Sequence, residues 1–127
     1  MVALLFAILP RPLLAQDDWV SMSISGAPSP REGHSAVWTG REMVVWGGQD
    51  GSGPLGNGAR FDPLTNTWRS MSAVNAPTAR AFHSAVWTGS EMILWSGLGG
   101  GTSGARYDPF ADTWTAIAAR RGRDGGF

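Results

Sequence analysis

Short apolar stretches separated by glycine, proline and polar residues run from position 34 to position 117. Each stretch covers only three to six residues, which is typical of β-strands and too short for helices. Glycine and proline between the stretches mark turns. The pattern predicts eight strands, and no helix of length is expected after residue 16. The predicted strands are His34–Thr39, Glu42–Gly47, Ala59–Phe61, Thr67–Met71, His83–Thr88, Glu91–Ser96, Ala105–Tyr107 and Thr113–Ile117.

The first part of this pattern returns 49 residues later. Residues 19–46 align without a gap with residues 68–95, and 17 of the 28 positions are identical. The longest shared block is His34–Gly40, which returns as His83–Gly89. Beyond the glycine-rich loop the offset falls to 46, because three residues are missing from the second loop; such deletions belong in exposed loops. A repeat of about 50 residues with glycine and aromatic marks is typical of β-propeller blades.

The repeat also predicts how the chain is organised. Trp19–Met22 matches Trp68–Met71, the fourth strand of the first unit, so we expect a lone outer strand that pairs with another blade. The predicted fold is all-β: two four-stranded antiparallel propeller blades plus one extra outer strand, which make an incomplete propeller. The expected parts are a signal peptide (1–15), the outer strand and a linker (16–32), a first blade (33–72), a linker and second blade (73–118) and a disordered tail (119–127).

Two further marks recur inside the units. A glycine pair follows an apolar strand, and an aromatic-Asp-Pro sequence precedes a tryptophan that lies seven residues past the aromatic. In the first unit these marks are Gly47, Gly48, Phe61, Asp62, Pro63 and Trp68; in the second they are Tyr107, Asp108, Pro109 and Trp114. Ser96-Gly97 stands where the second glycine pair is expected, so that turn is predicted to be looser.

This combination resembles the kelch repeat, and residues 34–46 are similar to the tandem kelch arrays of bacterial proteins. The resemblance covers about residues 19 to 118. It implies propeller blades that act as a non-catalytic binding module for protein or carbohydrate.

The first residues resemble a targeting segment. Val2–Leu9 is an unbroken apolar run, far shorter than the ~20 residues of a membrane-spanning helix. A secretory signal peptide cleaved after Ala15 fits this segment, which predicts a secreted or periplasmic protein with no membrane span. The alternatives are a wrongly assigned start codon or an apolar N-terminus that is not cleaved.

Composition excludes several kinds of chemistry. The chain has no cysteine, and its 10 basic and 10 acidic residues give a net charge of zero. A disulfide framework and a thiol nucleophile are therefore excluded, and bulk charge does not favour nucleic acid. His34 and His83 occupy equivalent positions and could bind a metal or act as a base, but no Asp or Glu lies at ligand spacing, which favours a structural role. No metal, cofactor or catalytic residue is expected.

Gly51–Gly56 matches the Gly-x-Gly-x-x-Gly pattern of dinucleotide sites. Such a site needs a helix N-terminus to hold the pyrophosphate. Pro54 lies inside the motif and a strand follows it, so the segment is interpreted as a loop.

The candidate ligand-binding residues lie in the linkers and loops. Arg31 and Arg80 precede the first strand of each unit, where the resemblance implies a position at the mouth of the central channel. A repeated arginine can hold a carboxylate or phosphate through two hydrogen bonds; the alternative is an arginine that stabilises the loop through a backbone carbonyl or an Asp. Asp50, Ser52 and Asn57 are the polar candidates of the first glycine-rich loop. The tryptophans of the apolar strands are interpreted as blade core rather than a sugar-binding surface: Trp38, Trp46, Trp87 and Trp95.

Two blades alone meet a physical difficulty. They form one interface and leave two apolar faces in water, although stability in repeat proteins grows with the number of interfaces. We therefore expect a fragment of a longer array, or an oligomer in which a second copy of the chain helps to complete the ring.

The function predicted is a non-catalytic kelch binding module of a larger exported propeller. The alternatives are a truncated or degenerate product without independent function, or a fragment of a kelch-like sugar-active enzyme. A copper site of the galactose oxidase type needs a Tyr–Cys crosslink and a second Tyr. With no cysteine and one tyrosine, this chain cannot supply it.

Overall fold

The computed structural model describes residues 19–118, and these residues form an all-β fold. The predicted signal peptide and the predicted disordered tail lie outside the described residues. Within residues 19–118 there is no helix long and apolar enough to cross a membrane.

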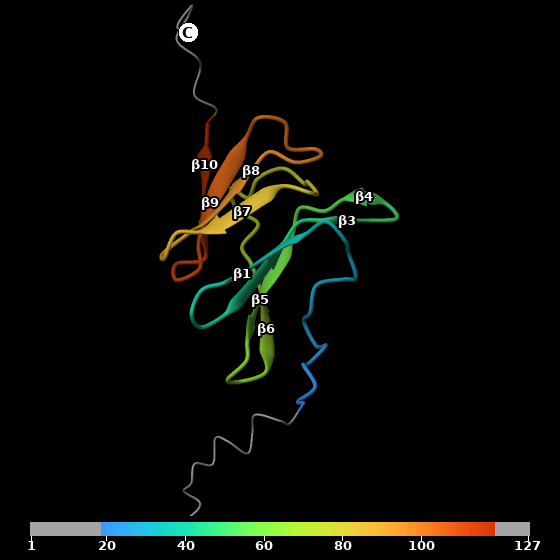
Figure 1. Cartoon of the computed structure of the whole chain (residues 1–127), viewed down its shortest axis with the longest axis vertical. Helices are drawn as coiled ribbons and strands as arrows, with labels where there is room; N and C mark the ends of the chain where they lie inside the picture. Colours follow the sequence, from blue (N-terminus) through green and yellow to red (C-terminus); the bar gives the residue numbers. More distant parts are fainter. Residues whose placement is uncertain (1–18, 119–127) are drawn as a thin grey trace, which may run out of the picture.

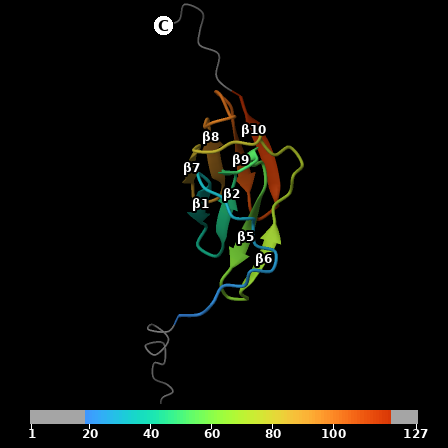
Figure 2. The same ribbon diagram turned by 90° about the vertical axis from the view of Figure 1, so that its right-hand side faces the viewer.

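Two four-stranded antiparallel sheets make up the fold, and in each sheet every strand pairs with its neighbour along the repeat. The sheets pack with the inner strands β1 and β7 next to each other (Figures 1 and 2). All eight predicted strands are confirmed, each to within one residue at either end. Blade 1 consists of β1 (Ser35–Trp38), β2 (Met43–Trp46), β5 (Gly58–Asp62) and β6 (Thr67–Ser70); blade 2 consists of β7 (Ser84–Trp87), β8 (Met92–Trp95), β9 (Gly104–Asp108) and β10 (Thr113–Ile117).

The Asp-Pro marks form the turns between the third and fourth strands of each blade. The carboxylates of Asp62 and Asp108 each accept the backbone N–H two residues later, at 2.9 and 2.8 Å. Asn66 and Asp112 close the turns with φ of 55° and 57°, a backbone region that Asn and Asp tolerate better than most residues. The repeated sequence therefore specifies the same turn twice.

The glycine-rich loop of blade 1 is more ordered than predicted. It contains a short hairpin of β3 (Gln49–Asp50) and β4 (Gly53–Pro54), which projects beside the blade (Figure 1). Gly53 has a φ of 122°, which a residue with a side chain rarely adopts. The loop of blade 2 is three residues shorter and has no such strand pair.

The segment Trp19–Met22, predicted to be an outer strand that pairs with another blade, is not part of any strand ladder among the described residues, so its pairing stays a prediction. A strand forms by pairing with a neighbour, and the described residues offer no third strand of a preceding blade to pair with. Trp19 is fully exposed as a result.

The residues that follow nevertheless dock as an inter-blade linker. The Ser23 N–H donates to Asn66 Oδ1 at 2.8 Å, and Trp68 Nε1 donates to the Ser23 carbonyl at 2.8 Å. Blade 2 receives the same pair of bonds, both 2.9 Å long, through Ser72, Asp112 and Trp114. The N-terminal segment therefore meets blade 1 as the linker of blade 1 meets blade 2.

The hydrophobic core lies between the two blades. The indole rings of Trp46 and Trp114 meet edge to face, with centroids 5.4 Å apart. The prediction that Trp46 belongs to the core is confirmed. Trp38, in contrast, is 54% exposed on the face of blade 1 that points away from blade 2. The buried members are Val44, Trp46 and Met71 from blade 1 with its following linker, and Met92, Leu94, Ala105, Tyr107 and Trp114 from blade 2.

Candidate functional site

The connections of the antiparallel sheets leave at two opposite ends. We call one the loop end; it holds the linkers before β1 and β7 and the glycine-rich loops after β2 and β8. The other is the turn end, with the β1–β2, β5–β6, β7–β8 and β9–β10 turns. All predicted ligand-binding residues lie at the loop end.

Arg80 is an internal brace of the loop end. Its side chain is almost fully buried, with the residue 1% exposed. Nη1 donates to the carbonyls of Ser96 and Ser103 at 3.2 and 2.7 Å, and Nε donates to the carbonyl of Thr78 at 3.0 Å. Burial lowers the pKa of Arg80. These contacts join the linker, the end of β8 and the far side of the loop.

Arg31 repeats this arrangement in blade 1. Its Nη1 donates to the carbonyls of Gly47 and Asn57, both at 3.0 Å, and its Nε to the carbonyl of Ser29 at 2.9 Å. Burial lowers the pKa of Arg31, while the charge of Asp50 acts in the opposite direction. For both arginines the contacts favour the alternative of a loop-stabilising residue.

The three polar candidates of the first loop separate into two groups. Asn57 joins Arg31, because its Oδ1 accepts from Nη1 at 3.1 Å. Asp50 and Ser52 lie on the projecting hairpin, where Asp50 Oδ1 accepts the Ser52 N–H at 2.7 Å. Both are exposed. Their role in binding a ligand stays a prediction.

The glycine pair is required by close backbone contacts. Gly47 and Gly48 have φ of 72° and 99°. A Cβ on Gly48 would lie 2.7 Å from the Glu32 carbonyl oxygen, and one on Gly47 would lie 2.7 Å from His83 Cε1. Blade 2 places Ser96 at the first of these positions with a φ of 64°.

His83 is held at the interface between the blades. Its Nε2 lies 3.0 Å from Ser35 Oγ, and its ring meets Trp46 edge to face. Burial, helped by the charges of Arg80 and His34, lowers the pKa of His83. Its Nδ1 is buried without a hydrogen-bond partner. Residues 19–118 hold no cluster of three or more metal-ligating side chains.

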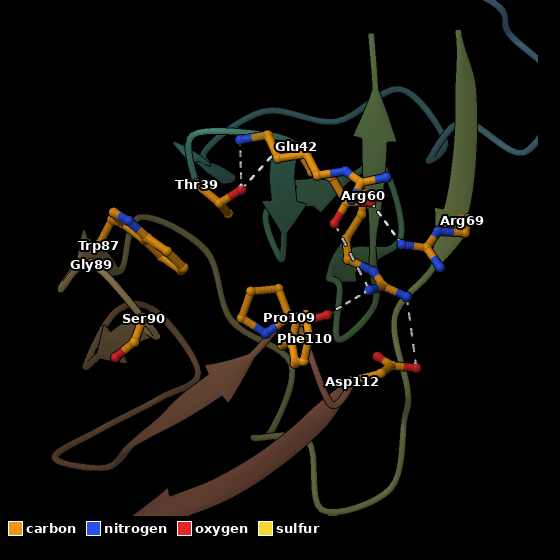
Figure 3. Close-up of a pocket in the computed structure, with 11 residues that line it drawn as sticks. Thr39, Glu42, Arg60, Arg69, Trp87, Gly89, Ser90, Pro109, Phe110 and Asp112 are labelled. Atoms are coloured by element: carbon orange, nitrogen blue, oxygen red, sulfur yellow. Dashed lines mark hydrogen bonds and ion pairs between the residues drawn. The ribbon is translucent and has the colours of Figure 1, made fainter. Parts of the chain in front are cut away.

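The turn end contains a pocket that the sequence did not predict. It lies between the two blades and has a volume of about 740 Å³ (Figure 3). Trp87, Pro109 and Phe110 line one part of it, and charged side chains line another. The charged set is Arg41, Glu42, Arg60, Arg69 and Asp112.

A polar network crosses this pocket from one blade to the other. Arg69 Nη2 pairs with Glu42 Oε2 at 2.8 Å, and this hydrogen bond and charge raise the pKa of Arg69. The buried Arg60 donates from Nη1 to the Pro109 carbonyl at 2.9 Å, and its Nη2 lies 3.9 Å from Asp112 Oδ2. The two blades are thus joined by charge as well as by the apolar core.

Asp112 anchors the end of that network. Its Oδ1 accepts from the Tyr107 hydroxyl at 2.6 Å and from the Ser72 N–H at 2.9 Å. Burial alone would raise the pKa of Asp112, but these hydrogen bonds and the charges of Arg60 and Arg69 lower it overall. Burial and the bond to Asp112 raise the pKa of Tyr107.

The repeat contained a signal for this pocket that sequence reasoning missed. Aligning the two units places Ser90 opposite Arg41, Thr115 opposite Arg69, and Asn66 opposite Asp112. Three of the five charged lining residues therefore stand where the other unit is uncharged. Glu42 and Arg60, in contrast, are repeated as Glu91 and Arg106.

Comparison with known proteins agrees with the repeated architecture. The chain matches the KLHDC2/KLHL20/DRC7 Kelch-repeats domain over residues 13–120, which is most of its length. No curated protein matches it. A kelch-repeat domain implies a propeller-type module for binding protein, in a family whose members are generally non-catalytic scaffolds. The repeated glycine pair, Asp-Pro turns and tryptophans, folded into two antiparallel blades, thus place this chain in the kelch-repeat family.

Proposed function

We propose that this chain is a non-catalytic binding module that presents its loop end to a protein partner. The proposal rests on one observation: the two blades hold their loops through the same arginine bonds, but the loops themselves differ. Arg31 and Arg80 make equivalent bonds in the two blades, while the loops they hold differ in length and in exposed side chains. Binding residues are commonly found on loops that a rigid scaffold positions.

Backbone bonds fix this frame across the blades. Glu32 and Gln49 exchange a pair of N–H···O bonds of 3.0 and 2.8 Å, as Ala81 and Leu98 do in the second unit. The Gly48 N–H also donates to the carbonyl of Arg80 at 2.9 Å, which links the first loop to the second linker. A partner would therefore meet a surface that needs little ordering on binding.

The exposed side chains of the loop end differ between the units and suit a protein. Leu98 and Phe82 are 57% and 62% exposed, whereas the equivalent residues in blade 1 are Gln49 and Gly33. The hairpin adds the exposed carboxylate of Asp50. Apolar anchors beside polar groups are the usual composition of a protein-binding surface.

Peptide selection from a random library on the full-length chain would test this proposal. The variant Phe82→Gly/Leu98→Gln gives blade 2 the residues of blade 1, and glycine suits the positive φ of position 82. We expect selected peptides to bind this variant about tenfold more weakly or worse. Leu64→Ala, an exposed apolar residue at the turn end, is the control. Equal peptide binding by the wild type, the double variant and the control would contradict the proposal. Binding to a glycan array without any peptide binding would also contradict it, and would favour the carbohydrate alternative.

We also propose that further blades cover the two open faces, supplied by a longer chain or by a second copy. The open face of blade 1 carries Trp38 and Met43, together with Phe61, which Trp68 already covers; their equivalents Trp87, Met92 and Tyr107 contribute to the core from blade 2. The open face of blade 2 carries Val86, Ile93 and Trp95, the equivalents of Val37, Val44 and Trp46. The two open faces are thus the two halves of the interface that already exists inside the chain.

Export remains a further part of the proposal, supported by the apolar N-terminal run. Expression in a secreting host followed by N-terminal sequencing would test it. A mature N-terminus at Gln16 would agree with cleavage after Ala15, and retention of Met1 on the secreted or cellular protein would contradict it.

A further inference from the structure

We propose that the pocket at the turn end binds an acidic peptide segment, in which a carboxylate lies next to an apolar side chain. This site lies at the opposite end of the blades from the proposed partner surface and is independent of it. The pocket combines two walls of different chemistry, an excess of arginine donors and an unpartnered aromatic side chain.

The two walls come from different blades. Blade 1 supplies Glu42, Arg60 and Arg69, whose guanidinium and carboxylate groups gather on one side of the opening in Figure 3. Blade 2 supplies Trp87 and Phe110 on the other side, together with Pro109. A ligand between them would meet charge on one face and aromatic rings on the other.

The charged wall has cationic donors to spare. The lining holds three arginines and two carboxylates, and both carboxylates already accept hydrogen bonds: Glu42 from Arg69, and Asp112 from Tyr107 and Ser72. Arg41 and Arg69 keep 74% and 60% of their side chains exposed. A guanidinium has five N–H donors, and within the described residues Arg41 makes one ion pair, with Asp62 at 3.5 Å. The group that fits is therefore an anion that can accept from more than one donor.

The apolar wall restricts the kind of anion. Phe110 is fully exposed and lines the pocket together with Trp87, so an apolar group of the ligand would cover ring surface that otherwise faces water. A nucleic acid or another polyanion would require many uncompensated cations. Here the lining arginines exceed the lining carboxylates by one, and the whole chain is neutral. A single carboxylate beside an apolar side chain matches both walls.

The repeat separates the binding groups from the structural ones. Glu42 and Arg60 are present in both units, where they pair within blade 1 at 4.0 Å, and Arg60 also donates to the Pro109 carbonyl of blade 2. Arg41 and Arg69, which supply the free donors, are replaced by Ser90 and Thr115 in the other unit. The blade frame does not require arginine at these two positions, so their function is specific to this pocket.

Titration of the full-length chain with a capped tetrapeptide, two glutamates flanked by leucines, tests the proposal by NMR. The reporter is the indole N–H signal of Trp87, assigned by its loss in Trp87→Phe. The variants Arg41→Ser and Phe110→Leu introduce the residues found at Ser90 and Leu64 in the other unit, and both change exposed side chains. Arg106→Ser and Leu64→Ala are matched controls outside the pocket.

We expect the peptide to shift the Trp87 signal in a saturable way, and its glutamine counterpart to bind at least tenfold more weakly. Arg41→Ser should weaken binding about five- to tenfold, because it removes a charge-assisted contact. Phe110→Leu should weaken it about two- to threefold, and the controls should leave it unchanged. No shift at Trp87, equal affinity for the glutamine peptide, or binding of inorganic phosphate in place of the peptide would overturn the proposal.

Discussion

Blade 1 and blade 2 carry equivalent residues, yet they bury different ones. Trp46 is 1% exposed between the blades, while its equivalent Trp95 lies partly exposed on the open face of blade 2. Arg60 is buried and bonded to Pro109, whereas Arg106 is exposed and 3.8 Å from Glu91. The difference arises from position in the stack, because among the described residues only one face of each blade packs against another blade.

The comparison explains why the strands are apolar on both faces. A strand that needed only one covered face would alternate apolar and polar residues. The β2 strand instead reads Met-Val-Val-Trp and the β8 strand Met-Ile-Leu-Trp. Each blade is therefore built to be covered on both sides, and among the described residues each has another blade on one side only.

The largest difference in stability between the two blades is expected at Trp46 and its equivalent Trp95. Trp46→Ala should lower the free energy of unfolding by about 3–5 kcal/mol, because it leaves a cavity against Trp114 and His83. Trp95→Ala should cost only about 1–2 kcal/mol while its face stays open. Urea unfolding of both variants measures the difference, and equal losses would show that the two faces are equally covered.

Arg80→Ala against Arg31→Ala is the next largest contrast. The loss of Arg80 leaves buried carbonyls without a donor, so we expect unfolding to become easier by about 2–4 kcal/mol. Arg31 makes the same bonds nearer to solvent, and its loss should cost about 1 kcal/mol. Chemical denaturation of the two variants measures this difference in the free energy of unfolding. If Arg31→Ala lowered the free energy of unfolding more than Arg80→Ala does, the greater burial of Arg80 would not explain the difference between the two arginines.

A smaller effect should come from the pair Tyr107 and Asp112, which replace the Phe61 and Asn66 of blade 1. Tyr107→Phe removes a 2.6 Å hydrogen bond and should cost about 1 kcal/mol at neutral pH. Because the folded state lowers the pKa of Asp112, its contribution is present above the ordinary value of 3.8 and is lost as the pH falls below it. The double variant Tyr107→Phe/Asp112→Asn should therefore show less acid destabilisation than the wild type. If this variant lost stability in acid as much as the wild type does, the Asp112 carboxylate would not be a source of the acid destabilisation.

The smallest expected effect concerns the two equivalent histidines. The folded state lowers the pKa of His83 from its ordinary value of 6.5, so folding favours the neutral ring. Stability should be complete above that pH and decline as the pH falls through and below it. His83→Gln should remove this part of the pH dependence, whereas His34→Gln, which removes only the smallest of the causes that lower the pKa of His83, should leave most of it. The slope of unfolding free energy between neutral and mildly acidic pH is the measurement, and a slope that survives in His83→Gln would refute the prediction.

Sequence alone could predict the blades because each repeat mark has a local cause. The Asp-Pro turns are fixed by hydrogen bonds over two residues, and the glycine pair is fixed by left-handed backbone and, at Gly48, by the close carbonyl of Glu32 in the same unit. Such causes act within one unit, so a single unit's sequence reveals them. The strand bounds followed from the same local patterns.

The rest depended on contacts between segments far apart in the chain. Trp19–Met22 has the sequence of an outer strand but lacks a partner among the described residues, and no local pattern predicts a missing partner. The pocket at the turn end joins Arg41 and Arg69 to Phe110, which come from different blades. Only the relative position of the blades brings these residues together. The alignment of the two units does, however, show that Arg41 and Arg69 are replaced by uncharged residues in the other unit.

Sedimentation equilibrium of the full-length chain over a wide concentration range would show whether the two open faces cover each other. If the two open faces are halves of one interface, the folded protein should associate beyond the mass of one chain. Trp38→Glu, which places a charge on the open face of blade 1, should restore the single-chain mass. A folded, cooperatively unfolding protein that stays a single chain at every concentration would show that the open faces need no cover, and would contradict the account.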